Sequence, residues 1–408
     1  MRRREQLTSH TDDRIIPRLT RKAVVGFAAV LPFAIWPGIE RPFSAPKIIL
    51  LAAFVLVTAS CAIAGRFSFP KLPLPCWISL AIWCLTLAVS GLQGEFTSQT
   101  AFWLPLLSVA WFLLVLAVQP RAEALTEALS VSLTLTALLA LFQYLGLDFF
   151  QHFGSTSPHF ESPRMRVYAT LGNPNFVAAF LAGGLPLTLV IGHWRRPRWL
   201  LLVVIILQAA ALFATGSRAA IIGTGAAVIW FAIVGKLGYW RILAIAGLVL
   251  LATLPLMPSR PLKTTLEGRL YIWRITAPHL SERPLFGFGP GGFEPKFAQW
   301  ETSYWREGRA ADNLRQFIGV QTHAHNDYLE TAVDHGFAGL VSLLALLTSF
   351  LAMAFPQSRR PKGELDSAAS AGIVALASIA LVDFPFHRPT EMFLFWTLLA
   401  LVCLKANR

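Results

Sequence analysis

Long apolar runs, repeated along most of the chain, are the feature that most restricts its fold. Most of them have about 17 to 25 residues, the length that a helix needs to cross a lipid bilayer. They lie at 23–36, 46–64, 74–92, 100–118, 124–147, 175–193, 199–215, 219–235, 240–257, 337–356, 368–384 and 390–404. Because 55% of the 408 residues are hydrophobic and only 14% are charged, a soluble protein is excluded. The sequence predicts an all-α polytopic membrane protein with about twelve transmembrane helices.

The basic residues indicate how these helices are oriented. If the N-terminus is cytoplasmic, the segments on that side hold 20 Lys and Arg residues, whereas the short connections on the other side hold six. This asymmetry follows the positive-inside rule. It predicts that both termini are cytoplasmic, and that the loop at 258–336 is outside. The excess positive charge behind the net charge of +13 then lies on the inner face, where anionic lipids attract it. No nucleic-acid partner is needed to explain this charge.

The longest polar interval divides the predicted protein into three parts. Transmembrane helices 1 to 9 occupy residues 1–257, a large outer loop occupies 258–336, and transmembrane helices 10 to 12 occupy 337–408. The loop is rich in Trp, Tyr and Phe, which argues against disorder and predicts an ordered, partly helical segment. Its aromatic residues fit either a surface that stacks against sugars or an isoprenoid, or a small core with an interfacial belt.

Two arginines on the outer side are candidates for binding an anion. Arg218 lies in the short Gly216-Ser217-Arg218 break between two apolar runs, and Arg269 lies four residues before Trp273 on one face of a predicted helix. A guanidinium presents a planar set of donors that suits a phosphate. The alternative for Arg218 is a side chain that extends to the lipid headgroups.

A histidine pair precedes the next predicted helix. His323 and His325 are followed by Asn326, and Asp327 with Glu330 three residues later indicates a helix start. The positive end of the helix dipole disfavours protonation of His325, and a neutral imidazole is a competent general base. The alternative is a capping and hydrogen-bonding role. A single straight helix over 327–356 would hold His325 about eleven residues above the apolar span, at ~1.5 Å per residue.

The same residues include possible metal ligands. His323, His325 and Asp327 match the His-x-His-x-Asp pattern of two-metal hydrolases, but that pattern continues with His where this chain has Tyr328. No further outward set of carboxylates and histidines follows at ligand spacing. The sequence therefore predicts no metal site and no cofactor.

These motifs resemble a known family. His325-Asn326, nine residues and then Gly336-Phe337-Ala338-Gly339 resembles the His-[Asn/Ser/Gln]-x9-Gly-x-x-Gly signature of bacterial O-antigen ligases, at the end of a large periplasmic loop. Residues 171–175, 216–218 and 268–273 look like further segments of the ligase and polymerase superfamily. The likeness covers roughly residues 160 to 345.

The resemblance implies a glycosyltransferase of the bacterial inner membrane. Known ligases move a glycan from undecaprenyl diphosphate to an acceptor, usually lipid A-core, by a metal-independent inverting transfer on the periplasmic side. Carried over to this chain, His325 would be the base or would orient the acceptor, Arg218 and Arg269 would bind the diphosphate, and Asn326 and His323 would support them. Arg166 is a weaker candidate for phosphate.

Two other functions stay open at this point. A polysaccharide polymerase uses the same donor but another polymer as acceptor, so the motifs do not separate it from a ligase. A small-anion transporter with Arg218 along its path belongs to a different class. Transporters often show internal repeats and broken midplane helices, and neither is evident in this sequence.

Overall fold

The computed structural model describes residues 2–64, 72–95, 98–150, 167–191, 197–234, 262–308, 312–355 and 363–405, and these residues form helices and no strand. The α-helices are α1 (Arg2–Val30), α2 (Ala45–Ala64), α3 (Leu74–Gln93), α4 (Gln99–Val118), α5 (Ala122–Tyr144), α6 (Pro174–Ile191), α7 (Arg198–Ala214), α8 (Arg218–Val234), α10 (Leu262–Thr276), α11 (Phe293–Arg306), α12 (Asp327–Ala352), α13 (Glu364–Ile379) and α14 (Pro389–Lys405). Short 3-10 helices are η1 (Leu31–Phe33), η5 (Ala277–Ser281), η6 (Asp312–Phe317) and η7 (Pro385–His387).

The apolar runs of the sequence correspond to these helices. A helix covers most of every predicted run except 240–257, which lies outside the described residues. In the described part of the chain, six helices are long and apolar enough to cross a membrane, namely α2 to α6 and α12. The helices α7, α8 and α14 are apolar as well but shorter. The protein is therefore a helical, multi-pass membrane protein. The count of twelve spans stays a prediction.

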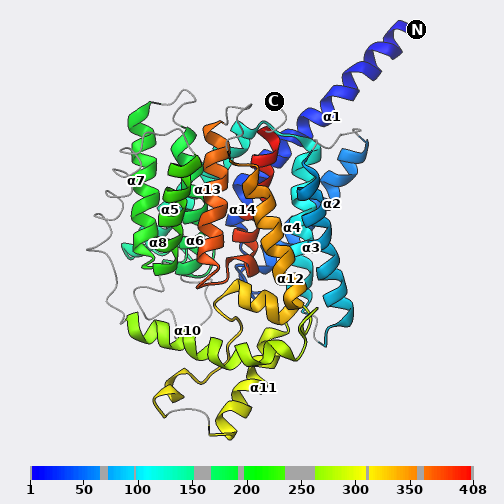
Figure 1. Ribbon diagram of the computed structural model, residues 1–408. Helices are drawn as coiled ribbons and strands as arrows, with labels where there is room; N and C mark the ends of the chain where they lie inside the picture. The colour runs from blue at the N-terminus through cyan, green and yellow to red at the C-terminus, as the bar shows by residue number, and fades with distance from the viewer. Residues whose placement is uncertain are drawn as a thin grey trace.

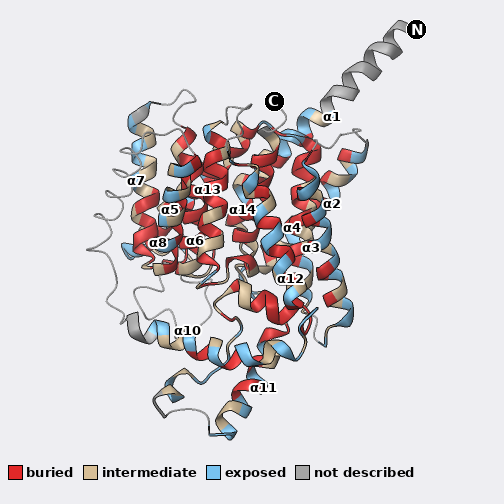
Figure 2. Cartoon of the chain, in the orientation of Figure 1, coloured by how far each residue is buried: buried red, intermediate tan, exposed pale blue. Residues whose placement is uncertain are grey.

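The centre of the bundle is built by close packing against α13. This helix contacts α6, α8 and α14, and the buried residues gather along these helices in Figure 2. Glycines allow the close approach: a Cβ on Gly372 would lie 2.2 Å from the carbonyl oxygen of Gly183, and a Cβ on Gly223 would lie 2.6 Å from Ile379 Cγ1. Because hydrocarbon gives no hydrophobic drive between helices, small residues at such interfaces stabilise the bundle through tight packing.

The segment from α10 to η6 covers the end of the bundle that is opposite to both termini (Figure 1). Its aromatic residues form a small core of their own, in which Tyr271, Phe288, Phe293, Phe297 and Trp300 are buried together with Ile272 and Ile275. Of the two interpretations left open by the sequence, the small core is the one that the structure shows. The part of the predicted loop that the structure describes is ordered and helical. That this end faces the periplasm stays a prediction.

A kink at Gly336 divides α12 into two parts. Gly336 has φ +67° and ψ −171° inside the helix, and Figure 1 shows its first part lying across the end of the bundle. The bend is held by the preceding loop, because Phe337 N donates to Pro284 O at 2.7 Å and Phe288 N donates to Val333 O at 2.9 Å. A side chain at 336 would place its Cβ 2.3 Å from the Leu285 carbonyl carbon, so only glycine fits.

Because of the kink, His325 does not lie far above the end of the bundle, as it would at the start of a straight helix. Residues 327–335 fold down onto the end of α13, where Asp327 N donates to Ala380 O at 2.9 Å. Residues 327–356 therefore do not form the single straight helix that would raise His325 above the apolar span. The backbone just before α12 lies at the level where α13 ends, so that His325 is beside the bundle and not above it.

Candidate functional site

His325 stands at the start of α12 in a strained backbone conformation. Its φ is +50°, a region that side chains other than glycine rarely adopt and that is frequent at functional sites. Asn326 is the N-cap, because its Oδ1 accepts from Tyr328 N and Leu329 N, each at 3.0 Å. The sequence predicted this helix start. The cap fixes the chain direction at His325, and the side chain is aimed at the segment that follows α13.

The His325 ring faces Asp383. Nδ1 of His325 lies 3.7 Å from Asp383 Oδ1, which is longer than a hydrogen bond, and neither this nitrogen nor Asp383 Oδ2 has a hydrogen-bond partner among the described residues. Because Nδ1 is buried while the side chain is 34% exposed, the accessible edge of the ring is the one that carries Nε2. Catalytic hydrogen bonds are often long without substrate, and a small ring movement would close this one.

Asp383 belongs to a buried ion pair. Arg388 Nη2 donates to Asp383 Oδ1 at 2.6 Å, and the two side chains are 3% and 1% exposed. Phe176 and Phe384 flank the guanidinium, with ring centroids 3.9 and 4.1 Å from its carbon. Burial raises the pKa of Asp383, but the charge of Arg388 and the facing His325 lower it by more. The pKa of Asp383 therefore lies below its usual range. Asp383 is therefore a carboxylate that can orient the His325 ring.

Arg269 of α10 reaches the same place. Burial lowers the pKa of Arg269, the charge of Asp383 raises it and the charge of Arg388 lowers it, so all three groups lie within electrostatic reach of one another. One turn further along α10, Trp273 Nε1 donates to Ala324 O at 2.9 Å. This bond ties the Arg269 helix to the residue beside His325. The predicted 268–273 motif and the histidine motif thus form one site.

Arg218 lies at the same end of the bundle. Helices α8 and α13 are antiparallel, since Ser367 Oγ contacts Val234 O at 3.4 Å and Gly223 packs against Ile379. Arg218 precedes Gly223 by five residues, which places it level with the 380–384 segment that follows α13. Arg218 therefore lies at the same end of the bundle as Arg269, His325 and Asp383.

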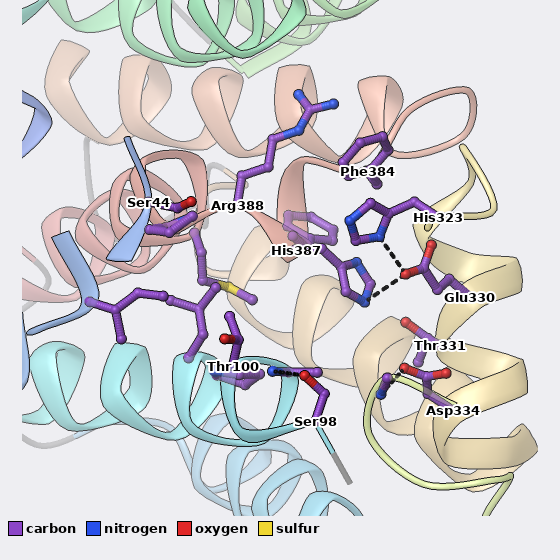
Figure 3. A pocket seen from close by; sticks show the side chains of 18 of the residues that line it. Ser44, Ser98, Thr100, His323, Glu330, Thr331, Asp334, Phe384, His387 and Arg388 are labelled. Carbon is purple, nitrogen blue, oxygen red and sulfur yellow. Dashed lines mark hydrogen bonds and ion pairs between the residues drawn. The ribbon is translucent and has the colours of Figure 1, made fainter. Parts of the chain in front are cut away.

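A second cluster of charges supports the histidine loop. Glu330 Oε1 accepts from His323 Nδ1 and Glu330 Oε2 from Ala324 N, both at 2.7 Å. His387 lies between two carboxylates, with Nδ1 at 2.5 Å from Asp327 Oδ1 and Nε2 at 3.5 Å from Glu330 Oε1. Figure 3 shows the contacts of Glu330 with His323 and His387. The cluster binds the backbone next to His325 and joins the start of α12 to the 383–388 segment. Its function in this account is to position His325 against Asp383.

The cluster also contains ligand types that a transition metal accepts. Ligand atoms of His323, Glu330 and His387 all lie within 4.8 Å of one another, and two imidazoles with a carboxylate suit zinc. A protonated His387 already supplies positive charge between Asp327 and Glu330, so the carboxylates are balanced by the chain itself. Burial lowers the pKa of His387, but Glu330, Asp327 and Asp334 raise it to about 10. The absence of a metal site stays a prediction.

The charge on His387 predicts a pH-dependent stability. In the unfolded chain its pKa is about 6.5, and in the folded protein it is about 10. The stabilisation is fully present below pH ~6.5 and is lost as the pH rises through about 10, at roughly 1.4 kcal/mol per pH unit between the two values. We expect His387→Gln to be less stable near neutral pH and to flatten this decline, measured as Tm in detergent from pH 6 to 10. An unchanged Tm profile in the variant would contradict the assignment.

The site contains residues that the sequence analysis did not select. Asp383 and Phe384 lie at the end of the predicted run 368–384, and His387 and Arg388 lie in the short connection that follows it. The signal was present, because charges of both signs at a membrane boundary have to be paired or used. Arg166 lies outside the described residues.

Fold and site together define a class: a multi-pass helical membrane protein with buried charges gathered at the end opposite to its termini. Residues 201–344, from α7 into α12, match the family model described as O-antigen ligase. This match supports the O-antigen ligase family, as the motifs predicted, and with it a ligase-like or polymerase-like function. No curated protein matches the chain.

Proposed function

We propose that this protein transfers a glycan from undecaprenyl diphosphate to an acceptor, lipid A-core or another glycan, at the end of the bundle that carries α10 and α11. In this proposal that end faces the periplasm of a bacterium and both termini are in the cytoplasm, because most Lys and Arg residues of the connections belong to the side of the termini. The observation that carries the proposal is the pairing of His325 with the buried Asp383 carboxylate beside Arg269, within a segment of the O-antigen ligase family.

The two candidate arginines supply what a diphosphate leaving group needs. The nearby negative charge of Asp383 is already balanced by Arg388 at 2.6 Å, so the positive charge of Arg269 is not cancelled by that carboxylate. Guanidinium groups fixed by helices bind phosphate oxygens and stabilise the charge that develops on them as the sugar leaves. Arg218 approaches the same place from α8. A fixed pair of guanidiniums performs this task without a metal ion.

His325 would activate the acceptor. Asp383 orients the ring through Nδ1, which leaves Nε2 to accept the proton of the acceptor hydroxyl. The acceptor oxygen then bonds to the anomeric carbon from the face opposite to the diphosphate, and the bond from that carbon to the diphosphate oxygen breaks. The electron pair leaves with the undecaprenyl diphosphate, the anomeric centre is inverted, and His325 returns its proton to solvent.

The proposal is tested with the purified full chain in lipid nanodiscs. We expect transfer from a lipid-linked glycan donor to lipid A-core in the presence of a chelator, with an inverted linkage in the product. Capped lipid A-core identifies a ligase, whereas lengthened lipid-linked chains identify a polymerase. If the protein binds donor and acceptor yet forms neither product, or if only added divalent metal restores transfer, the proposed mechanism is wrong.

A further inference from the structure

A cavity of about 490 Å³ lies beside the His325 site, on the other side of Phe384 and Arg388. Its walls come from the first turns of α2 and α4, from the start of α11 with Gly291 before it, from α12 and from α14 (Figure 3). The volume falls within the range of about 300–1,000 Å³ that small-ligand sites occupy. The cavity is therefore large enough to hold part of a substrate.

One wall is shared with the proposed transfer site. Phe384 stacks on His323 with ring centroids 4.0 Å apart and meets the edge of His325 at 5.2 Å. His323 lines the cavity, whereas His325, Asp383 and Arg269 do not. A ligand in the cavity and a diphosphate between the arginines would thus lie on different sides of the same aromatic ring. In-line transfer needs two substrates that approach one carbon from opposite sides.

Five residues with hydroxyl groups line the cavity, and three of them are central to its recognition of a ligand. These three are Ser44 before α2, Thr100 in the first turn of α4 and Thr331 in α12. None of them has a side-chain hydrogen-bond partner among the described residues. Hydroxyls both donate and accept, and they match the alternating donors and acceptors of a sugar. Polar groups of this kind give an otherwise apolar pocket its specificity.

Most of the charged side chains that line the cavity already have interaction partners. Glu330 is held by His323 and His387, and the Asp334 carboxylate accepts from Gly291 N at 2.7 Å and from Phe293 N at 2.9 Å. Arg388 is paired with Asp383 and Glu391. What is left is one positive and one negative side chain, Arg41 and Glu294. A phosphate would find little uncompensated positive charge in this cavity, and an uncharged sugar would find hydroxyls.

The other end of the cavity is apolar and reaches the surface of the bundle. Leu346, Met392 and Phe395 line it and are buried, whereas Ile49 lines it and is 60% exposed. Ile49 lies in the first turns of α2, a helix long and apolar enough to cross a membrane. A hydrocarbon chain can therefore pass from the lipid into the cavity along α2.

We propose that this cavity binds the acceptor of the reaction as a glycolipid, with an uncharged sugar against Ser44, Thr100 and Thr331 and the adjoining hydrocarbon against Ile49, Leu346 and Met392. This inference rests on the proposed function, because the ligand is an acceptor only if the protein transfers a glycan. It adds where the acceptor binds and which of its chemical groups are recognised. It also assigns opposite sides of Phe384 to the two substrates, the arginine side to the donor diphosphate and the hydroxyl side to the acceptor, whose hydroxyl attacks the donor sugar.

The test is equilibrium binding of a fluorescent dodecyl β-glucoside to the full chain in nanodiscs, with no donor present. We expect saturable binding that unlabelled dodecyl glucoside displaces better than dodecyl diphosphate does. Thr100→Val and Thr331→Val should each weaken binding about threefold to tenfold, as the loss of one hydrogen bond does. Ile49→Trp, which fills the apolar entrance, should weaken it as well. Thr348→Val on the exposed face of α12 is the matched control and should leave binding unchanged.

Two outcomes overturn the proposal. One is binding that Thr100→Val, Thr331→Val and Ile49→Trp all leave unchanged. The other is stronger displacement by dodecyl diphosphate, which would mean that the cavity binds the donor. The transfer assay separates this proposal from the proposed function. If transfer occurs but the KM for the acceptor is the same in Thr331→Val, the cavity proposal alone fails. If the glycoside binds as expected but His325→Ala transfers normally, only the proposed function fails.

Discussion

Replacing His325 by alanine is expected to lower the rate of glycan transfer by about 10²–10⁴-fold, the usual contribution of a positioned general base. The imidazole is the titratable group that faces the buried Asp383 carboxylate while its other edge stays accessible. The loss should appear in kcat, because the ring acts on the acceptor hydroxyl in the transition state and contributes little to donor binding.

The controls for this variant come from the same chain. His279→Ala removes a histidine that stacks on Trp300 and contacts Glu282 in the loop, away from Asp383, and should retain transfer. Asp383→Asn should also lower the transfer rate, because the amide no longer favours the tautomer with its proton on Nδ1. The loss should be smaller than in His325→Ala, because the imidazole that accepts the proton is still present. Full activity of His325→Ala in a variant that folds and binds donor would remove His325 from the mechanism.

Replacing Arg269 by alanine is expected to lower kcat/KM for the donor by about 10²–10³-fold, comparable with the removal of one fixed group that stabilises a developing negative charge. Arg218→Ala should have an effect of the same order. Lysine should restore only part of the activity at either position, because an ammonium cannot offer two parallel donors to a phosphate. The measurement is steady-state kinetics against the lipid-linked donor at saturating acceptor.

Arg274 offers a matched control for Arg269. It lies on the same helix α10 and is exposed, whereas Arg269 is within electrostatic reach of Asp383 and Arg388. Arg274→Ala should therefore keep donor kinetics close to those of the unaltered protein. Equal losses in the Arg269 and Arg274 variants would show a general dependence on positive charge in the loop, and the specific role of Arg269 would be withdrawn.

Much of the helical framework could be predicted because the bilayer enforces it. A chain in hydrocarbon must satisfy its backbone internally and span a fixed thickness, so the predicted runs 74–92 and 100–118 differ by only one residue at an end from α3 and α4. The helix start at Asn326 could also be predicted, since it depends on local capping. Arg218, Arg269 and His325 were selected as candidates, and the structure places them at one end of the bundle.

The parts that the sequence did not reveal depend on contacts between distant segments. Gly336 looks like any glycine in an apolar pattern, and its kink follows from the backbone of residues 284–288 lying against it. Asp383 lies inside the predicted apolar run 368–384 and His387 follows it, and their partners His325 and Asp327 are about 60 residues away. The cavity beside Phe384 needs the positions of α2, α4, α12 and α14 together.

The most direct test of the central claim is an experimental structure, by electron cryomicroscopy in nanodiscs, of the protein bound to a polyprenyl diphosphate sugar. We expect the diphosphate to lie between the guanidiniums of Arg218 and Arg269, with the anomeric carbon close to Nε2 of His325. A diphosphate bound to other residues, with Arg269 or His325 not in contact with the ligand, would contradict the claim.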